Sequence, residues 1–285
     1  MTPLRQQMIE AMQLRGFSTR THESYLYAVE QLVRYHRIPP DRLSTPQLQA
    51  FFKHLALEKE LAPASCRLYL NGVRFFYLKV LNWKDFEVSM VVPKRQQRIP
   101  ALLSHEEVSR IINACANPKH RMLLETCYGC GLRVSELVSL RVRDIDGERK
   151  LLRIEQGKGA KDRQVMIAPT LLDRLRRYWQ EQRPADWLFP NHQHREQPLS
   201  ISTAQKVYRR AKQAAGIDKI GGIHSLRHAY ATHQLENGLA VYQLQRLLGH
   251  QQLQSTMRYV HWVPSEQRGA QGHADLIGAL AVGRG

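Results

Sequence analysis

Residues 150–168 read KLLRIEQGKGAKDRQVMIA, and this stretch departs from the helical periodicity of its surroundings. Leu152 and Ile154 mark a period of two in its first part, and the same period returns around Val165. Such alternation is typical of half-buried strands. Between the two parts, residues 157–162 (GKGAKD) combine turn-forming glycines with two lysines. The stretch therefore predicts an antiparallel hairpin that carries lysine at its tip.

On both sides of this hairpin, apolar residues recur every three or four positions, as they do on helices. Ser104 and Glu107 form a capping-box pattern before one such segment, and Pro118 opens the next. A short helical pattern covers residues 133–140, and another begins at Pro169. The second half of the chain is therefore predicted to be helical around one small antiparallel sheet.

Residues 1–81 contain only helical patterns, and prolines mark their limits. The pair Pro39-Pro40 ends one helix, whereas Pro46 and Pro63 each stand just inside the start of another. Four amphipathic helices of these lengths form a small bundle. The predicted fold class is therefore mainly α, with a small antiparallel β-sheet in the second domain only.

The composition changes over residues 84–103, which are basic, bounded by prolines and poor in core residues. These features indicate a linker. We expect a helical domain over residues 1–83, the linker over 84–103, a second domain over 104–263 and a tail over 264–285. Within the tail, residues 274–282 form a candidate docking helix.

The charge of the chain indicates its partner. Lys and Arg number 42 and Asp and Glu 25, a net charge of +17, with +7 over residues 1–98 and +10 over residues 99–285. A strongly basic chain is expected to bind a polyanion. Nucleic acid is the leading candidate, because two basic domains joined by a basic linker could both contact it. No apolar run of about 18 residues could form a transmembrane helix. An anionic membrane is the competing polyanion, but it usually needs a basic amphipathic helix or a compact basic cluster, so no membrane partner is expected. Without a signal peptide, a cytoplasmic protein is expected.

Five short motifs in the second half concentrate the chemically capable residues. In chain order they are Gly131-Leu132-Arg133-Val134-Ser135-Glu136-Leu137, Gly157-Lys158-Gly159, His224-Ser225-Leu226-Arg227-His228, Leu247-Leu248-Gly249-His250 and Thr256-Met257-Arg258-Tyr259. Guanidinium groups match phosphate oxygens, and a tyrosine hydroxyl can attack phosphorus and store the bond energy as phosphotyrosine. Lysine and histidine can move the protons. The set therefore suits phosphodiester cleavage without metal or nucleotide, and no cofactor is expected.

The order and spacing of these motifs resemble the tyrosine recombinase (phage integrase) family, above all its Xer-like and integron-integrase-like branches. The resemblance covers the whole chain, since the helical first half matches a core-binding, SAM-like domain. It implies that Arg133 and Arg227 clamp the scissile phosphate. It also implies Lys158 as general acid for the leaving 5′-hydroxyl, with Lys161 as the alternative.

The resemblance gives the remaining roles to two histidines and a tyrosine. His224 would assist proton transfer, His250 would bind the scissile phosphate, and Tyr259 would be the nucleophile. His228 and His233 are expected to support the site or to contact DNA. A rival tyrosine, Tyr242, is predicted to pack in the core.

The family resemblance further implies site-specific recombination of double-stranded DNA through a 3′-phosphotyrosyl intermediate and a Holliday junction. The expected assembly is a homotetramer on two DNA sites, associated with the bacterial nucleoid, with accessory proteins as further candidate partners and the tail docked onto a neighbour. Two alternatives remain open at this stage. One is relaxation of DNA in the manner of a type IB topoisomerase, and the other is DNA binding without catalysis.

For some of these residues, a purely structural role is the alternative to a functional one. Glu136 can pair with Arg133 across one helical turn. The lone Cys127/Cys130 pair cannot close a zinc site, so buried free thiols are expected. His224, His228 and His233 could share a helix face, but they lack the His-Glu-x-x-His spacing of a helical zinc site. We therefore expect no metal site.

Overall fold

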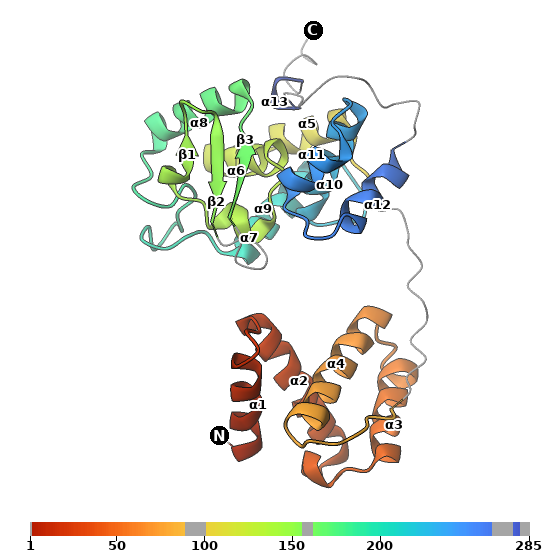
Figure 1. Ribbon diagram of the computed structural model, residues 1–285. Helices are drawn as coiled ribbons and strands as arrows, with labels where there is room; N and C mark the ends of the chain where they lie inside the picture. The colour runs from red at the N-terminus through yellow and green to blue at the C-terminus, as the bar shows by residue number, and fades with distance from the viewer. Residues whose placement is uncertain (1, 89–100, 156–161, 264–275, 280–285) are drawn as a thin grey trace. The chain divides into compact units, whose positions relative to one another are not determined.

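The computed structural model describes residues 2–88, 101–155, 162–263 and 276–279 (Figure 1). Contacts divide the chain into two compact units, Met1–Arg98 and Ile99–Gly285. The division falls inside the stretch for which the sequence predicts a linker, and residues 89–100 of that stretch lie outside the described residues. The precise limits proposed for the four segments stay predictions.

The first unit is a bundle of helices, as the sequence predicts. Its α-helices are α1 (Pro3–Gln13), α2 (Thr19–His36), α3 (Thr45–Lys53) and α4 (Pro63–Lys79), with a 3-10 turn at Pro40–Arg42 and a π turn at His54–Glu58. Helices α2 and α4 form its main contact. They approach closely at Gly72, where an added Cβ would lie 3.0 Å from Ala28 Cβ. Met12, Leu32 and Val73 are fully buried between the helices.

The second unit is larger and surrounds a separate hydrophobic core. Its first elements are α5 (His105–Asn113), α6 (Pro118–Gly129), α7 (Val134–Val138), a 3-10 turn (Val142–Asp144), β1 (Ile145–Asp146), β2 (Leu151–Ile154) and β3 (Arg163–Met166). Its later elements are α8 (Pro169–Gln182), α9 (Ile201–Ala214), α10 (His224–Glu236), α11 (Val241–Leu248), α12 (Gln254–Trp262) and α13 (Leu276–Ala279).

The sheet is antiparallel with strand order β1-β2-β3, which confirms the predicted hairpin. Leu152 pairs with Val165, and both side chains are buried because they share one face of the hairpin. Strand β1 is not apparent in the sequence, since two residues are too few to display a period. The hairpin tip at residues 156–161 lies outside the described residues.

Helices α6 and α10 form the centre of the second unit. They pack on each other, and further helices cover them, α8 on α6 and α12 on α10 (Figure 1). Most residues of both helices are buried, among them Tyr128 on α6 and Tyr230 on α10. Side chains carried by α10 are therefore anchored on a rigid element.

The short helix α13 packs on its own unit. Leu276 and Ile277 are buried against α6 and α8, and a Cβ added to Gly129 would lie 2.9 Å from Ile277 Cγ1. It occupies part of the candidate docking helix at residues 274–282, the rest of which lies outside the described residues. No helix within the described ranges is long and apolar enough to cross a membrane.

Candidate active site

Five of the six predicted site residues line one cavity of about 500 Å³ in the second unit. They are Arg133 at the start of α7, His224 and Arg227 on α10, His250 after α11 and Tyr259 on α12. The sixth, Lys158, and its alternative Lys161 lie outside the described residues. Arg133 and Tyr259, which are 126 positions apart in the chain, thus line the same cavity.

Arg227 is the most deeply buried cation of this cavity, with 1% of its surface exposed. Its Nη1 donates to the carbonyl of Gly131 at 2.5 Å, and its Nη2 donates to the carbonyl of Leu248 at 2.7 Å. Burial and the charge of Arg133 lower the pKa of Arg227 to about 10, so it stays charged at neutral pH. Arg227 is therefore a cation held in a fixed orientation.

Two glycines make these arginine contacts possible. Gly131 has a φ of +59°, and an added Cβ would lie 2.3 Å from Tyr230 Cδ1. Gly249 has a φ of +61°, and its carbonyl accepts a hydrogen bond from Arg133 Nη2 at 3.2 Å. Both backbone conformations favour glycine, so the motifs need these residues for the shape of the backbone.

The carboxylate of Glu136 lies close to three arginines of the site. It accepts hydrogen bonds from Arg133 Nη1 at 2.7 Å and from Arg163 Nη1 and Nη2 at 2.7 and 2.8 Å, and it lies 3.9 Å from Arg227. Burial raises the pKa of Glu136, but the hydrogen bonds and charges of Arg163 and Arg133 outweigh it and hold the pKa at about 2. The predicted pairing of Glu136 with Arg133 is confirmed, as one part of a larger network.

Arg163 is a residue of the site that the sequence motifs do not include. Its side chain is 10% exposed, and besides binding Glu136 its Nε donates to the carbonyl of Leu247 at 3.0 Å. The sequence does contain a signal for it. Arg163 lies two positions before the buried Val165, so both side chains are on the same face of strand β3. An arginine on the buried face of a strand requires a buried carboxylate.

Tyr259 lies inside the cavity with 4% of its surface exposed. Its hydroxyl is 3.0 Å from Nδ1 of His228. Burial raises the pKa of Tyr259, although the charges of Arg227, Arg258 and Arg133 oppose the shift. The phenol is therefore protonated at neutral pH, and attack on phosphorus requires a base beside it.

His228 is the histidine in contact with that phenol. Burial, His224 and Arg227 together lower the pKa of His228 to about 4, so its ring is neutral and can accept a proton. His224 packs edge-on against His228, with ring centroids 5.4 Å apart. The histidine that touches the tyrosine is thus His228, whereas the family resemblance gives the proton-transfer role to His224.

His250 is held from both ring nitrogens. Arg227 Nη2 donates to His250 Nε2 at 3.2 Å, so the proton of the neutral ring is on Nδ1, which lies 2.9 Å from the hydroxyl of Thr256. Its ring is parallel to that of Tyr259, with centroids 6.2 Å apart. Burial and the neighbouring arginines lower the pKa of His250 to about 4. Thr256 orients this histidine, and no sequence motif singled it out for that role.

Three residues outside the cavity complete the comparison with the sequence. Cys127 and Cys130 are buried free thiols, as predicted, and burial raises the pKa of each to about 12. The prediction that Tyr242 packs in the core is wrong, since it is 63% exposed on the outer side of the amphipathic helix α11.

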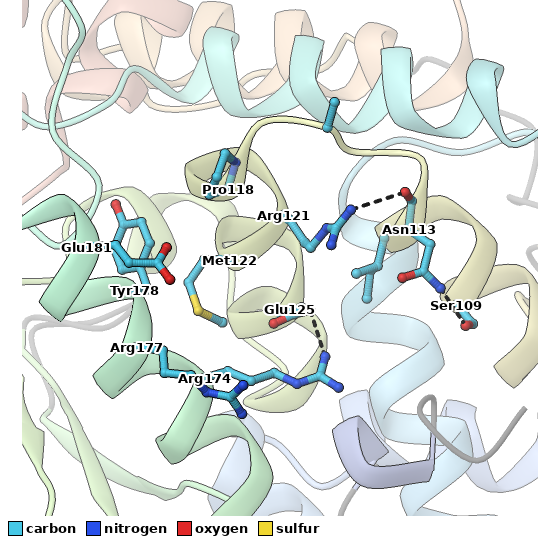
Figure 2. A pocket seen from close by; sticks show the side chains of 12 residues that line it. Ser109, Asn113, Pro118, Arg121, Met122, Glu125, Arg174, Arg177, Tyr178 and Glu181 are labelled. Carbon is cyan, nitrogen blue, oxygen red and sulfur yellow. Dashed lines mark hydrogen bonds and ion pairs between the residues drawn. The ribbon is translucent and has the colours of Figure 1, made fainter. Parts of the chain in front are cut away.

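A second cavity of about 500 Å³ lies between α5, α6 and α8 (Figure 2). It contains several charged groups, three of which are engaged by each other or by the backbone. Arg174 donates to the carboxylate of Glu125 at 2.7 Å, and Arg121 donates to the carbonyl of Asn113 at 3.4 Å (Figure 2). Because its side chains do not converge on the open space around a nucleophile, the cavity of Tyr259 remains the candidate active site.

Comparison with known proteins gives matches over both units. Residues 101–266 match the phage integrase family, and residues 4–85 match the SAM-like N-terminal domain of phage integrases. An integrase/recombinase of Escherichia coli is 30% identical over 98% of this chain and 95% of its own length. The tyrosine recombinase XerD of Pseudomonas putida is 32% identical over 81% of this chain and 83% of its own.

A solved structure shares the fold. The site-specific recombinase XerH, bound to its palindromic difH substrate in a post-cleavage complex, superposes with a TM-score of 0.70 at 20% identity. The match covers 90% of this chain and 80% of that one. It supports the arrangement of helices and strands described above.

Proposed function

The chain belongs to the phage integrase family of tyrosine recombinases, and from this premise we propose that it cuts and rejoins duplex DNA with Tyr259 as the nucleophile. One observation carries the proposal: the Tyr259 hydroxyl shares a cavity with two fixed guanidinium groups, Arg133 and Arg227, and touches the neutral ring of His228. A nucleophile, a base and a pair of cations for a phosphate are thus adjacent.

The chemistry follows from these contacts. The hydroxyl of Tyr259 attacks the scissile phosphorus, the bond to the 5′-oxygen breaks, and a 3′-phosphotyrosyl bond forms. His228 Nδ1 accepts the proton of the phenol. Lys158, to which the family resemblance gives the role of general acid, would supply the proton of the leaving 5′-hydroxyl, with Lys161 as the alternative. The reverse sequence rejoins the strand, so the reaction needs no nucleotide to store energy.

The arginines stabilise the charge that builds up on the phosphate in this reaction. A guanidinium has five N–H donors, and the three hydrogen bonds of Arg227 to Gly131, Leu248 and His250 leave two for phosphate oxygens. Arg133 lies at the rim of the cavity, with 18% of its side chain exposed, and can add a second contact. His250 would donate to the phosphate from Nε2 after its proton moves from Nδ1 to Nε2, with the Thr256 hydroxyl then donating to Nδ1 and Arg227 Nη2 turned to the phosphate.

Double-stranded DNA is the proposed partner. Support comes from the net charge of +17, which both units share, and from XerH, whose structure holds its DNA substrate. We extend the proposal to a homotetramer on two DNA sites that exchanges strands through a Holliday junction. Accessory proteins and docking of the C-terminal tail on a neighbour belong to the same proposal.

Two assays on one supercoiled plasmid test this function. A plasmid that carries two copies of the target site should yield recombinant circles. A plasmid with one copy should yield a covalent adduct but little relaxation. Rapid relaxation without recombinants would favour the topoisomerase alternative. Chelators should leave cleavage intact, because every proposed step uses side chains alone.

A further inference from the structure

A cluster of metal-ligand side chains lies outside the catalytic cavity, where α5 meets the C-terminal end of α10. His105 begins α5, and His233 and Glu236 are three residues apart on α10. One potential ligand atom of each residue lies within 4.8 Å of the other two. We propose that His105, His233 and Glu236 bind a single divalent transition-metal ion, with Zn²⁺ as the preferred ion.

The two imidazoles direct the same nitrogen to one point. Their rings are stacked, with centroids 3.7 Å apart and planes inclined by 19°. Nδ1 of His233 lies 2.9 Å from the hydroxyl of Tyr128, and Nδ1 of His105 lies 3.3 Å from the same hydroxyl. Both Nδ1 atoms therefore face the hydroxyl of Tyr128.

His233 is already in the tautomer that a metal requires. Its Nε2 is 2.9 Å from the carbonyl oxygen of Leu103, which can only accept, so Nε2 carries the proton and Nδ1 has the lone pair. A ligating histidine ordinarily donates its other N–H to a carbonyl or carboxylate in this way. Because the residue is 3% exposed, the orientation of the ring is also fixed.

Glu236 supplies the anionic ligand. It is half-buried, and no hydrogen bond or ion pair within the described parts of the chain engages its carboxylate. One of its carboxylate oxygens lies within 4.8 Å of a ring nitrogen of each histidine. A half-buried carboxylate without a partner carries a desolvation cost that a bound cation would offset.

The ligand set selects the class of ion. Two imidazoles and one carboxylate are a familiar zinc set, with water in the fourth position. Water can enter from the adjoining open cavity of about 570 Å³, which is lined in part by Lys219 and Thr232. Mg²⁺ and Ca²⁺ prefer oxygen ligands throughout, so they suit this cluster poorly.

Binding requires a small closure of the cluster. Tetrahedral zinc bonds of about 2.0 Å place ligand atoms about 3.3 Å apart, and these atoms lie within 4.8 Å. His105 and Glu236 are only half-buried, so rotation of their side chains can bring them in while His233 stays in place. The ion takes the place of the hydrogen bond between Tyr128 and His233.

This set differs from the one that the sequence suggests. Spacing along α10 groups His233 with His224 and His228, but those two histidines face the catalytic cavity. The partner that completes the cluster is His105, which is 128 positions away in the chain. A bound ion would fix the end of α10 to α5, so its role is structural, and no step of DNA cleavage passes through it.

Titration of the metal-free full chain with ZnCl₂, in competition with a chromophoric chelator, tests the proposal. The wild type should bind one equivalent, and His105→Gln and Glu236→Gln should each weaken that binding at least tenfold. His192→Gln, which alters an exposed loop histidine, should bind as the wild type does. Equal affinity in all four proteins, or no binding by the wild type, would overturn the proposal.

Two further measurements separate a lost site from a lost fold. The metal-free variants should unfold at the same temperature as the metal-free wild type, and Zn²⁺ should raise the melting temperature of the wild type and His192→Gln alone. X-ray absorption of the zinc-loaded wild type should show nitrogen and oxygen ligands at about 2.0 Å, two of them from imidazoles. A spectrum with sulfur ligands would place the ion at the cysteines and contradict the assignment.

Discussion

The guanidinium of Arg163 holds the carboxylate of Glu136 through two hydrogen bonds, at 2.7 and 2.8 Å. This pair joins strand β3 to the start of α7, where Arg133 lies. A bidentate arginine–carboxylate pair fixes direction as well as distance. The pair therefore sets the position of the hairpin relative to the arginines.

Arg163→Lys should slow DNA cleavage more than it weakens DNA binding. Lysine keeps the charge but cannot make the paired hydrogen bonds to Glu136. A displacement of about 1 Å at a catalytic group costs roughly 100-fold in rate, so we expect the single-turnover cleavage rate to fall about 10- to 100-fold. The affinity for target DNA should change less than threefold.

Arg153→Lys is the matched control for this change. Arg153 lies on the neighbouring strand β2, is 58% exposed and pairs with Asp162 near the surface. Its replacement should leave the cleavage rate within twofold of the wild type. Similar losses in the two variants would show that the Arg163 pair has no special positioning role.

Gly249→Ala should destabilise the second unit. Gly249 has a φ of +61°, and its new Cβ would lie 2.8 Å from Arg163 Cδ. A left-handed backbone costs a non-glycine residue about 1–2 kcal/mol, and displacement of Arg163 adds to it. Gly216→Ala isolates the backbone effect, because Gly216 has a φ of +66° and open space around it. Denaturant unfolding should show the larger loss for Gly249→Ala, and equal losses would mean that Arg163 adjusts freely.

Cleavage should resist mild acid. His228 and His250 have pKa values lowered to about 4, chiefly by burial, so both rings stay neutral until the pH falls to that range. A base with a lowered pKa works above that pKa and is lost below it. The second-order rate constant for cleavage, which reports the free protein, should therefore be level from pH 8 to about 5.5 and fall below it. An acid limb near pH 6.5 would indicate an exposed, unshifted histidine and contradict this account.

DNA affinity should fall steeply with salt. Lys and Arg outnumber Asp and Glu by 17, and each phosphate contact releases counterions when it forms. A protein with 6–10 phosphate contacts loses roughly 10³- to 10⁵-fold in affinity between 50 and 200 mM salt. Fluorescence anisotropy with a labelled duplex measures this slope. A flat response over that range would argue against an extensive basic interface on duplex DNA.

Local patterns predicted most of the fold. The hairpin was evident because residues 150–168 repeat every two positions, and proline and capping signals marked the helices. Strand β1 was not predictable, since its two residues pair only because the chain folds back on β2. The exposure of Tyr242 was equally hidden, because the apolar side of α11 runs through Leu244 and Leu248 instead.

The candidate site, too, was predictable only in part. Motif spacing identified the side chains that meet in the cavity, but it could not identify which histidine touches the tyrosine. His224 and His228 lie one turn apart on α10, and only their packing against α12 gives His228 the contact with Tyr259. Arg163 escaped notice because its partners, Glu136 and the carbonyl of Leu247, are 27 and 84 positions away.

The central claim is that Tyr259 attacks the DNA, and its most direct test is to trap the covalent complex and identify the linked residue. The full chain should be incubated with genomic fragments, digested, and sequenced both as peptide and as DNA. We predict a nucleotide attached to Tyr259, and no adduct from Tyr259→Phe, which should still bind the same DNA. An adduct at another residue, or one that persists in Tyr259→Phe, would contradict the account.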